Sequence, residues 1–95
     1  MRIYISGPMS GVDDYKNNFR YAGKFLLLEK HEVIDPTAFD GILPKLTYEE
    51  YMKFDLALLD LCDAIYMLKG WEKSLGANRE YGYALAAGKQ IMMEE

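Results

Sequence analysis

Apolar residues along this chain alternate between two spacings, one typical of strands and one typical of helices. Short apolar and β-branched runs predict four strands, at residues 2–6, 32–34, 64–68 and 90–93. Between these runs, apolar residues at helical spacing predict three helices, over about 14–29, 47–61 and 75–87. Strands and helices therefore alternate along the whole sequence.

Local signals mark several of the predicted boundaries. Thr47-Tyr48-Glu49-Glu50 has the pattern of a capping box, so the second helix is expected to begin there. Gly88 suits the C-terminal cap of the third helix, and Asp35-Pro36 ends the second strand. Residues 37–46 and 70–73 are expected to form loops, the first of them a flap.

Strand-helix alternation with short connections predicts an α/β fold with right-handed crossovers. We expect a three-layer Rossmann-like (flavodoxin-like) parallel sheet of about four strands, in the order 2-1-3-4, with about three helices. Ligands in such sheets bind beyond the carboxyl ends of the strands. In this chain, the segments expected at those ends are residues 7–11, the loop after Pro36 and residues 69–74. The 95 residues contain no linker or repeat, so residues 1–95 are expected to form a single domain.

Composition and charge narrow the classes of function. The chain is 51% hydrophobic and 27% charged, as in globular proteins. A net charge of −4 argues against binding of polymeric nucleic acid, although backbone amides can still hold one small phosphorylated ligand. Neither a signal peptide nor a membrane-length apolar run is present, so a cytoplasmic protein with no membrane partner is expected.

The sequence offers no metal or disulfide chemistry. The lone Cys62 excludes an intrachain disulfide framework and a Cys-rich zinc site, and it is expected to be a small buried residue. His31 lies among charges in a turn and is expected at the surface. Asp63 is expected to order its turn through its side chain. No metal ion and no cofactor is predicted.

The third predicted helix carries one carboxylate on a face of small residues. Helical spacing places along this side Gly76, Ala77, Glu80, Ala84 and Ala87. An unpaired buried carboxylate is costly, so Glu80 would need partners or a function. It is either the wall of a ligand pocket near a helix start that could hold an anion, or a first-turn Glu that reaches solvent. Spacing alone leaves both interpretations open.

Two other regions carry candidate residues. Asp55 lies about 60° from the centre of the inner stripe of its helix, at the border between a pocket-facing and a solvated position. The loop Ser6-Gly7-Pro8-Met9-Ser10-Gly11 would let a ligand approach its amides, but it has neither the P-loop nor the dinucleotide pattern. An ordinary turn is the alternative there, as plain core is for Tyr4.

The chain resembles the nucleoside 2-deoxyribosyltransferase family, and most closely its branch of 2'-deoxynucleoside 5'-monophosphate N-glycosidases. The resemblance rests on Tyr4 to Gly11, on Asp55-Leu56 with Asp63 eight residues later, and on Ser74 to Ala84. These segments extend over nearly the whole chain, and the last is the most specific. The resemblance implies that Glu80 is the nucleophile that attacks the anomeric carbon.

The same resemblance implies roles for further residues. Asp55 matches an acidic residue that assists at the base and sugar, and Tyr4 a strand-one Tyr near the nucleophile. Ser74 matches a Ser used toward the 5'-phosphate, where transferases of free nucleosides tend to carry Asp. Pro8 departs from the loop pattern, so another small polar residue of the loop would have to serve. The implied substrate-binding set is Ser6, Gly7, Ser10, Gly11, Ser74 and Gly76.

The preferred hypothesis is cleavage of the N-glycosidic bond, or deoxyribosyl transfer, on 2'-deoxynucleoside 5'-monophosphates. The acceptor is either water or a second base. One alternative is a binding module of the same fold that senses or sequesters a nucleotide without turnover. Another is an interaction protein that uses exposed Tyr and Met. The expected partners are a small deoxynucleotide and further copies of this chain, as a homodimer or larger, because one small subunit has few loops with which to enclose a nucleotide.

Overall fold

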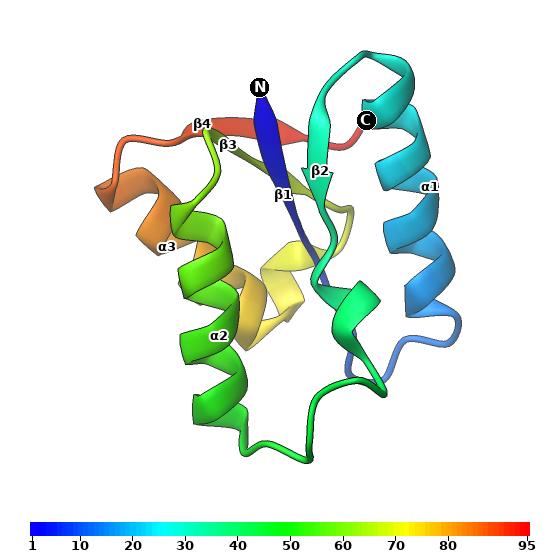
Figure 1. Ribbon diagram of the computed structural model, residues 1–95, viewed down its shortest axis with the longest axis vertical. Helices are drawn as coiled ribbons and strands as arrows, with labels where there is room; N and C mark the ends of the chain where they lie inside the picture. Colours follow the sequence, from blue (N-terminus) through cyan, green and yellow to red (C-terminus); the bar gives the residue numbers. More distant parts are fainter.

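The computed structural model describes all residues, 1–95, and contains one four-stranded parallel sheet in the order β2-β1-β3-β4. The strands are β1 (Arg2–Ser6), β2 (Glu32–Ile34), β3 (Ala64–Met67) and β4 (Gln90–Met93). The helices are α1 (Tyr15–Leu28), α2 (Tyr48–Asp60) and α3 (Leu75–Ala86), with two 3-10 turns, η1 (Pro36–Phe39) and η2 (Trp71–Lys73). Helix α1 covers one face of the sheet, and α2 and α3 cover the other (Figure 1). The predicted fold and strand order are confirmed.

Strand β1 is central, and it is buried on both faces because side chains alternate along a strand. Ile3 and Ile5 point toward α1 and pack in one cluster with Phe19 and other residues of that helix. Tyr4, between them, points to the opposite face and joins the cluster beneath α2 and α3. Residues near the carboxyl end of β1 can therefore reach side chains of α3.

Capping interactions fix where α2 and α3 begin and end. The Thr47 hydroxyl accepts the Glu50 N–H at 3.2 Å, and the Glu50 carboxylate accepts the Thr47 N–H at 2.9 Å. This is the predicted capping box. Gly88 follows α3 with φ of 73°, a left-handed conformation that Gly adopts without strain.

The structure differs from the sequence prediction at two short segments. Residues 36–39 and 71–73 form 3-10 turns where loops were predicted. At the first of these, the Asp35 carboxylate accepts the N–H and the hydroxyl of Thr37, and Pro36 supplies a fixed φ at the first position. Turns of three or four residues are too short to show a helical period, so only their capping residues could have revealed them.

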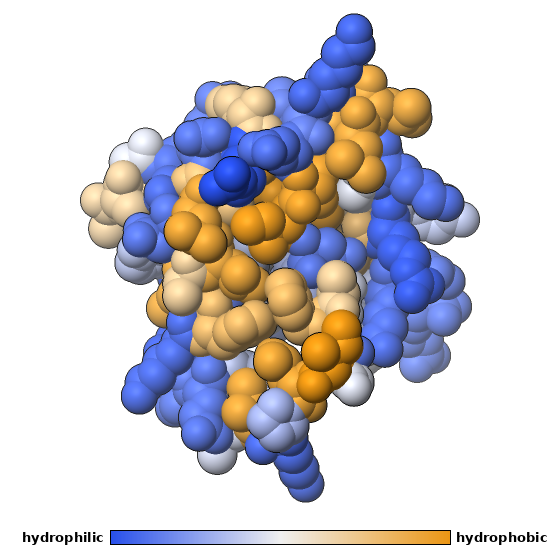
Figure 2. All heavy atoms as spheres, in the orientation of Figure 1, coloured by the Kyte–Doolittle hydropathy of each residue, from blue (hydrophilic) through white to orange (hydrophobic).

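The outer surface of α1 carries an apolar stripe. Tyr21, Phe25 and Leu28 recur at helical spacing and are 72%, 50% and 83% exposed. This is the only helix on its face of a four-stranded sheet. On the face drawn in Figure 2, apolar side chains also gather in the centre and in the lower part of the molecule. None of the helices combines the length and the hydropathy that a bilayer crossing requires.

The expected homodimer can be tested at the stripe of exposed apolar residues on α1. Light scattering should give at least twice the 10.9 kDa monomer mass at micromolar concentration. Leu28→Lys should shift the protein toward monomer, because it puts a charge in the exposed stripe while remaining compatible with a helix C-terminus. Leu61→Lys, at the exposed end of α2, is the matched control. A wild-type monomer, or dissociation by Leu61→Lys alone, would contradict this prediction.

Candidate active site

Glu80 is the buried carboxylate around which the candidate site is arranged. Its residue is only 6% exposed, although it lies in a helix whose first turn faces the open edge of the sheet. The Tyr4 hydroxyl donates to Oε2 at 2.6 Å and the Ser6 hydroxyl donates to Oε1 at 2.6 Å. Both donors come from β1, so the two oxygens are fixed from the same strand. The stripe of small residues thus marked a buried carboxylate, and the solvent-facing alternative is wrong.

The protonation of Glu80 is shifted by this environment. Burial raises the pKa of Glu80 to about 7, against the opposing effect of the hydrogen bonds from Ser6 and Tyr4. The negative charge of Asp55 adds a smaller upward contribution. Burial, followed by the charge of Glu80, also raises the pKa of Tyr4 well above its usual value, so Tyr4 stays a donor. Tyr4 is therefore a polar partner of the carboxylate and not plain core.

Asp55 provides a second carboxylate on the same side of the molecule. It lies on α2, half-buried, in the border position that the helical period predicted. Burial, and then the charge of Asp40, raise the pKa of Asp55 to about 6. Two carboxylates with raised pKa values on adjacent helices are a sign of acid-base chemistry.

Both carboxylates line a cavity of about 1030 Å³ at the carboxyl ends of the strands. Its walls include the three segments expected at the carboxyl ends of the strands, which are residues 7–11, the segment after β2 and residues 69–74. The first half of α2 also contributes to the wall. The predicted site residues at this cavity are Gly7, Ser10, Gly11, Asp55, Ser74, Gly76 and Glu80. Its volume is at the upper end of the range for small-molecule sites and can accommodate a nucleotide.

Tyr4 and Ser6 do not line this cavity. Ser6 was expected at the substrate, but it is the last residue of β1, fully buried, and its hydroxyl is bound to Glu80. It therefore positions the carboxylate from behind. Gly7 follows it in a crowded place, where a Cβ would lie 2.7 Å from Cβ of Leu68. A side chain at position 7 would push the first loop away from β3.

One end of the cavity is suited to an anion. Ser74 caps α3, and its hydroxyl accepts the Ala77 N–H at 3.1 Å. The first N–H groups of a helix have no intrahelical acceptor, and they carry partial positive charge. Lys73 precedes the cap and Gly76 follows it, both at the cavity wall. Lys73 was not predicted, although a cation beside a capping Ser was visible in the sequence.

The other side of the cavity is aromatic and contains an acidic residue that the sequence did not single out. Phe39 and Phe54 meet edge to face, with ring centroids 5.1 Å apart. Asp40 follows Phe39 and accepts the Tyr15 hydroxyl at 2.9 Å, with Lys16 Nζ at 3.8 Å. In the sequence, the position of Asp40 shortly after the carboxyl end of β2 was the feature that could have indicated a place at the cavity.

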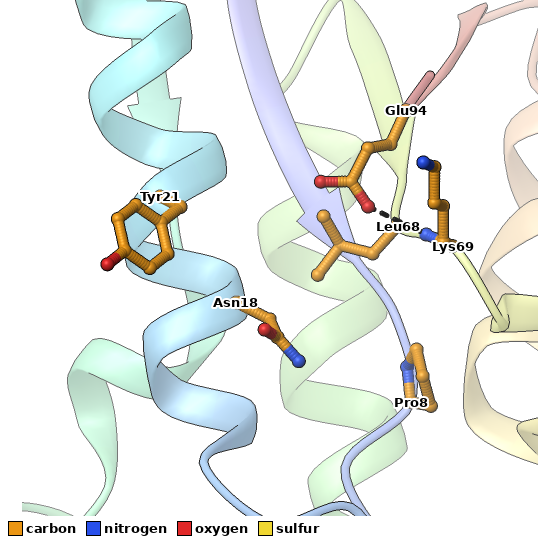
Figure 3. A pocket seen from close by; sticks show the side chains of 6 residues that line it. All are labelled: Pro8, Asn18, Tyr21, Leu68, Lys69 and Glu94. Carbon is orange, nitrogen blue, oxygen red and sulfur yellow. Dashed lines mark hydrogen bonds between the residues drawn. The ribbon is translucent and has the colours of Figure 1, made fainter.

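A smaller hollow of about 270 Å³ lies on the α1 side of the first loop (Figure 3). Its lining residues are Pro8, Asn18, Tyr21, Leu68, Lys69 and Glu94. Glu94 turns back over Lys69 and accepts its backbone N–H at 2.9 Å (Figure 3). That carboxylate disfavours a bound anion here, so the helix start in the larger cavity is the better place for an anion.

The remaining polar residues named from the sequence lie elsewhere. Asp63 accepts the Arg2 N–H at 2.9 Å and so joins the start of β1 to the turn before β3. His31 is half-exposed beside the N-terminal amine. Cys62 is buried, and burial raises the pKa of its thiol to about 11, which makes it a poor nucleophile. No group of His, Cys, Asp and Glu side chains is arranged to hold a metal ion.

The burial of Glu80 predicts a specific dependence of stability on pH. Its pKa in the folded state, about 7, lies above the ordinary value of 4.5. The folded state therefore binds more protons than the unfolded state between these values, and the free energy of unfolding falls as pH rises through them. Glu80→Gln should be more stable than the wild type near pH 8, by roughly 2–4 kcal/mol. Urea unfolding near pH 5 and near pH 8 measures this difference.

The exposed Glu29→Gln is the control for that experiment and should leave the pH dependence unchanged. Asp55 contributes in the same direction, between 3.8 and about 6, so part of the fall should persist in Glu80→Gln. A Glu80→Gln protein with the full wild-type fall would show that Glu80 is not the buried titrating group.

Solved structures with the same fold include enzymes that act on nucleosides and nucleotides. A 2-deoxyribosyltransferase from Bacillus psychrosaccharolyticus aligns with a TM-score of 0.77 and 22% identity, over 98% of this chain and 71% of that one. A CMP N-glycosidase from Clostridium botulinum aligns with a TM-score of 0.71 and 22% identity, over 98% and 70%. A 2-desoxiribosyltransferase from Leishmania mexicana aligns with a TM-score of 0.67 and 27% identity, over 97% and 62%.

These similarities establish a deoxyribosyltransferase-like fold, and the aligned proteins are longer than this chain. The search of curated proteins finds no match. The family model described as "Domain of unknown function (DUF4406)" matches residues 1–93. Because this model spans nearly the entire sequence, the chain belongs to the DUF4406 family.

Proposed function

We propose that this protein cleaves the N-glycosidic bond of 2'-deoxynucleoside 5'-monophosphates, or transfers their deoxyribosyl group, with Glu80 as the nucleophile. The observation that carries the proposal is the buried Glu80 carboxylate, held by Tyr4 and Ser6 at the wall of a nucleotide-sized cavity. The fold supports it, since similar structures include two deoxyribosyltransferases and an N-glycosidase.

The chemistry divides into two displacements at the anomeric carbon C1'. In the first, an ionised Glu80 oxygen forms a bond to C1' as the bond from C1' to the base nitrogen breaks. The electron pair of that bond leaves with the base, which takes a proton from Asp55. In the second, water or another base attacks C1', the ester to Glu80 breaks, and the proton of the attacking group returns to Asp55. The carboxylate of Glu80 is then restored.

The environments of the two carboxylates fit these roles. A carboxylate in a site of low dielectric interacts strongly with the positive charge that develops on the sugar. Ser6 and Tyr4 hold the two oxygens before that charge appears, so little reorganisation is needed. With a pKa of about 6, a fraction of Asp55 is protonated near neutrality, and the reactive form is the one in which Asp55 holds a proton while Glu80 is ionised.

The phosphate subsite follows from the start of α3. Ser74, the first N–H groups of α3 and Lys73 lie together at the cavity wall. A phosphate held there would anchor the nucleotide with its sugar near Glu80, since Ser74 and Glu80 lie less than two turns apart on one helix. The small residues between them leave room for the sugar.

A binding module that sequesters nucleotides without turnover is the second candidate. The same cavity and helix start would serve it, and raised pKa values alone do not require catalysis. Incubation with a panel of deoxynucleotides, followed by chromatography for free base, separates the two candidates.

Replacing the nucleophile should abolish most of the turnover. Glu80→Gln keeps the shape of the side chain but removes its charge, so base release should fall at least ~10²-fold, a barrier increase of about 2.7 kcal/mol. Nucleotide binding should be retained. Asp55→Asn should slow release less, with the larger effect on bases that leave poorly. Rates come from chromatography of the free base.

Asp60→Asn is the control, because Asp60 is an exposed residue of α2 whose carboxylate accepts the Tyr83 hydroxyl, away from the cavity. It should keep wild-type rates. If the wild type releases no base from any deoxynucleotide, the binding module takes the place of the enzyme. Full activity in Glu80→Gln would leave the fold intact and remove Glu80 as nucleophile.

Ser74→Ala should weaken a bound deoxynucleoside monophosphate by about 1 kcal/mol or more, the loss of a hydrogen bond to a charged group. The free nucleoside should bind almost unchanged. Thr47→Ala is the matched control, since it also removes a helix N-cap but lies outside the cavity. Isothermal titration of both ligands measures the effect. Equal losses for nucleotide and nucleoside in Ser74→Ala would remove Ser74 from the phosphate subsite.

A further inference from the structure

Asp40 is a carboxylate that the proposed reaction does not use, although it lies at the same cavity. It ends η1, and its backbone N–H donates to the Thr37 carbonyl at 3.1 Å. The Tyr15 hydroxyl donates to Oδ2 at 2.9 Å, and Lys16 Nζ lies 3.8 Å from the same oxygen. The backbone of Asp40 is thus held by its own turn, and the side chain by residues of α1.

This arrangement leaves acceptor capacity directed at a ligand. The contacts from Tyr15 and Lys16 are both to Oδ2, while Oδ1 has no partner in the protein. The Asp40 side chain is 28% exposed, so it is neither sealed in the core nor freely solvated. Asp40 is therefore a fixed acceptor at the cavity wall.

The surroundings of Asp40 suit a planar ring. Phe39 comes immediately before it and packs edge to face with Phe54, and both rings line the cavity. A base stacked on these aromatic side chains would present its polar edge to the neighbouring carboxylate. The opposite end of the cavity, at the start of α3, is the proposed phosphate site. The long axis of a nucleotide would thus run from Ser74, past Glu80, to Asp40.

We infer that Asp40 selects the base, and that the substrates are deoxynucleotides whose base carries an exocyclic amino group, such as cytosine or adenine. This inference rests on the proposed function and names its substrate class. The amino group of such a base donates a hydrogen bond to a carboxylate. Uracil and hypoxanthine carry a carbonyl oxygen at the same place. That oxygen would face Oδ1 with no proton between them.

Asp55 strengthens the same preference. Asp40 and Asp55 are close enough for the charge of one to raise the pKa of the other. No hydrogen bond contributes to the pKa shift of Asp55, so its oxygens also remain available. While Asp55 is ionised, a base that brings donors to this side of the cavity relieves the repulsion between the two carboxylates. A base that brings only carbonyl oxygens there increases it.

Two pairs of ligands exchange the amino group for a carbonyl oxygen. dCMP differs from dUMP, and dAMP from dIMP, in this exchange and in the adjacent ring nitrogen, which changes from an acceptor to an N–H donor. Isothermal titration of Glu80→Gln, which binds without turnover, should show at least about tenfold tighter binding of the amino-bearing member of each pair. Asp40→Asn should remove the preference or reverse it, because an amide can donate to the carbonyl oxygen.

Asp13→Asn is the matched control, because Asp13 is an exposed carboxylate near the first loop that does not line the cavity. It should keep the wild-type preference. Equal binding within each pair, or a preference that survives Asp40→Asn, overturns the inference. Selective binding without base release by the wild type would overturn the proposed reaction and support the role of Asp40. Base release at equal rates from both members of each pair would support the proposed reaction and overturn the role of Asp40.

Discussion

The hydrogen bonds from Tyr4 and Ser6 to the buried Glu80 carboxylate are the interaction on which the candidate site depends. A carboxylate removed from water without partners would cost several kcal/mol or remain neutral. Two hydroxyls from β1 reduce that cost and also fix both oxygens. Burial still raises the pKa of Glu80 to about 7, so the protein keeps a buried titratable carboxylate at the expense of stability in the upper pH range.

The sheet order explains how these groups meet. β1 lies between β2 and β3, so the loops after all three strands surround its carboxyl end. Tyr4 and Ser6 are separated by one residue and point to the same face, the one that α3 covers. Small side chains on the inner surface of α3 let Glu80 approach the strand. Position in the fold, more than any local motif, therefore makes Glu80 a candidate nucleophile.

The sequence predicted the features that depend on periodicity. Alternating patterns located every strand and every α-helix, and the stripe around Glu80 gave a buried carboxylate as one of two interpretations. Residues whose role depends on distant contacts were not found. Asp40 gains its importance from Tyr15 and Lys16, which belong to another helix. Ser6 was read as part of a ligand loop, but the pairing of β1 with β3 carries it into the core.

Covalent capture of the sugar by Glu80 is the central claim, and the stereochemistry of transfer tests it most directly. In the presence of methanol as an acceptor, two displacements at C1' return the sugar to its original configuration, while a single direct displacement inverts it. Proton NMR of the methyl glycoside formed from a β-deoxynucleotide distinguishes the two. If Glu80 captures the sugar, the wild type should give the β product. An α product would show that the acceptor attacks directly and that Glu80 forms no bond to the sugar.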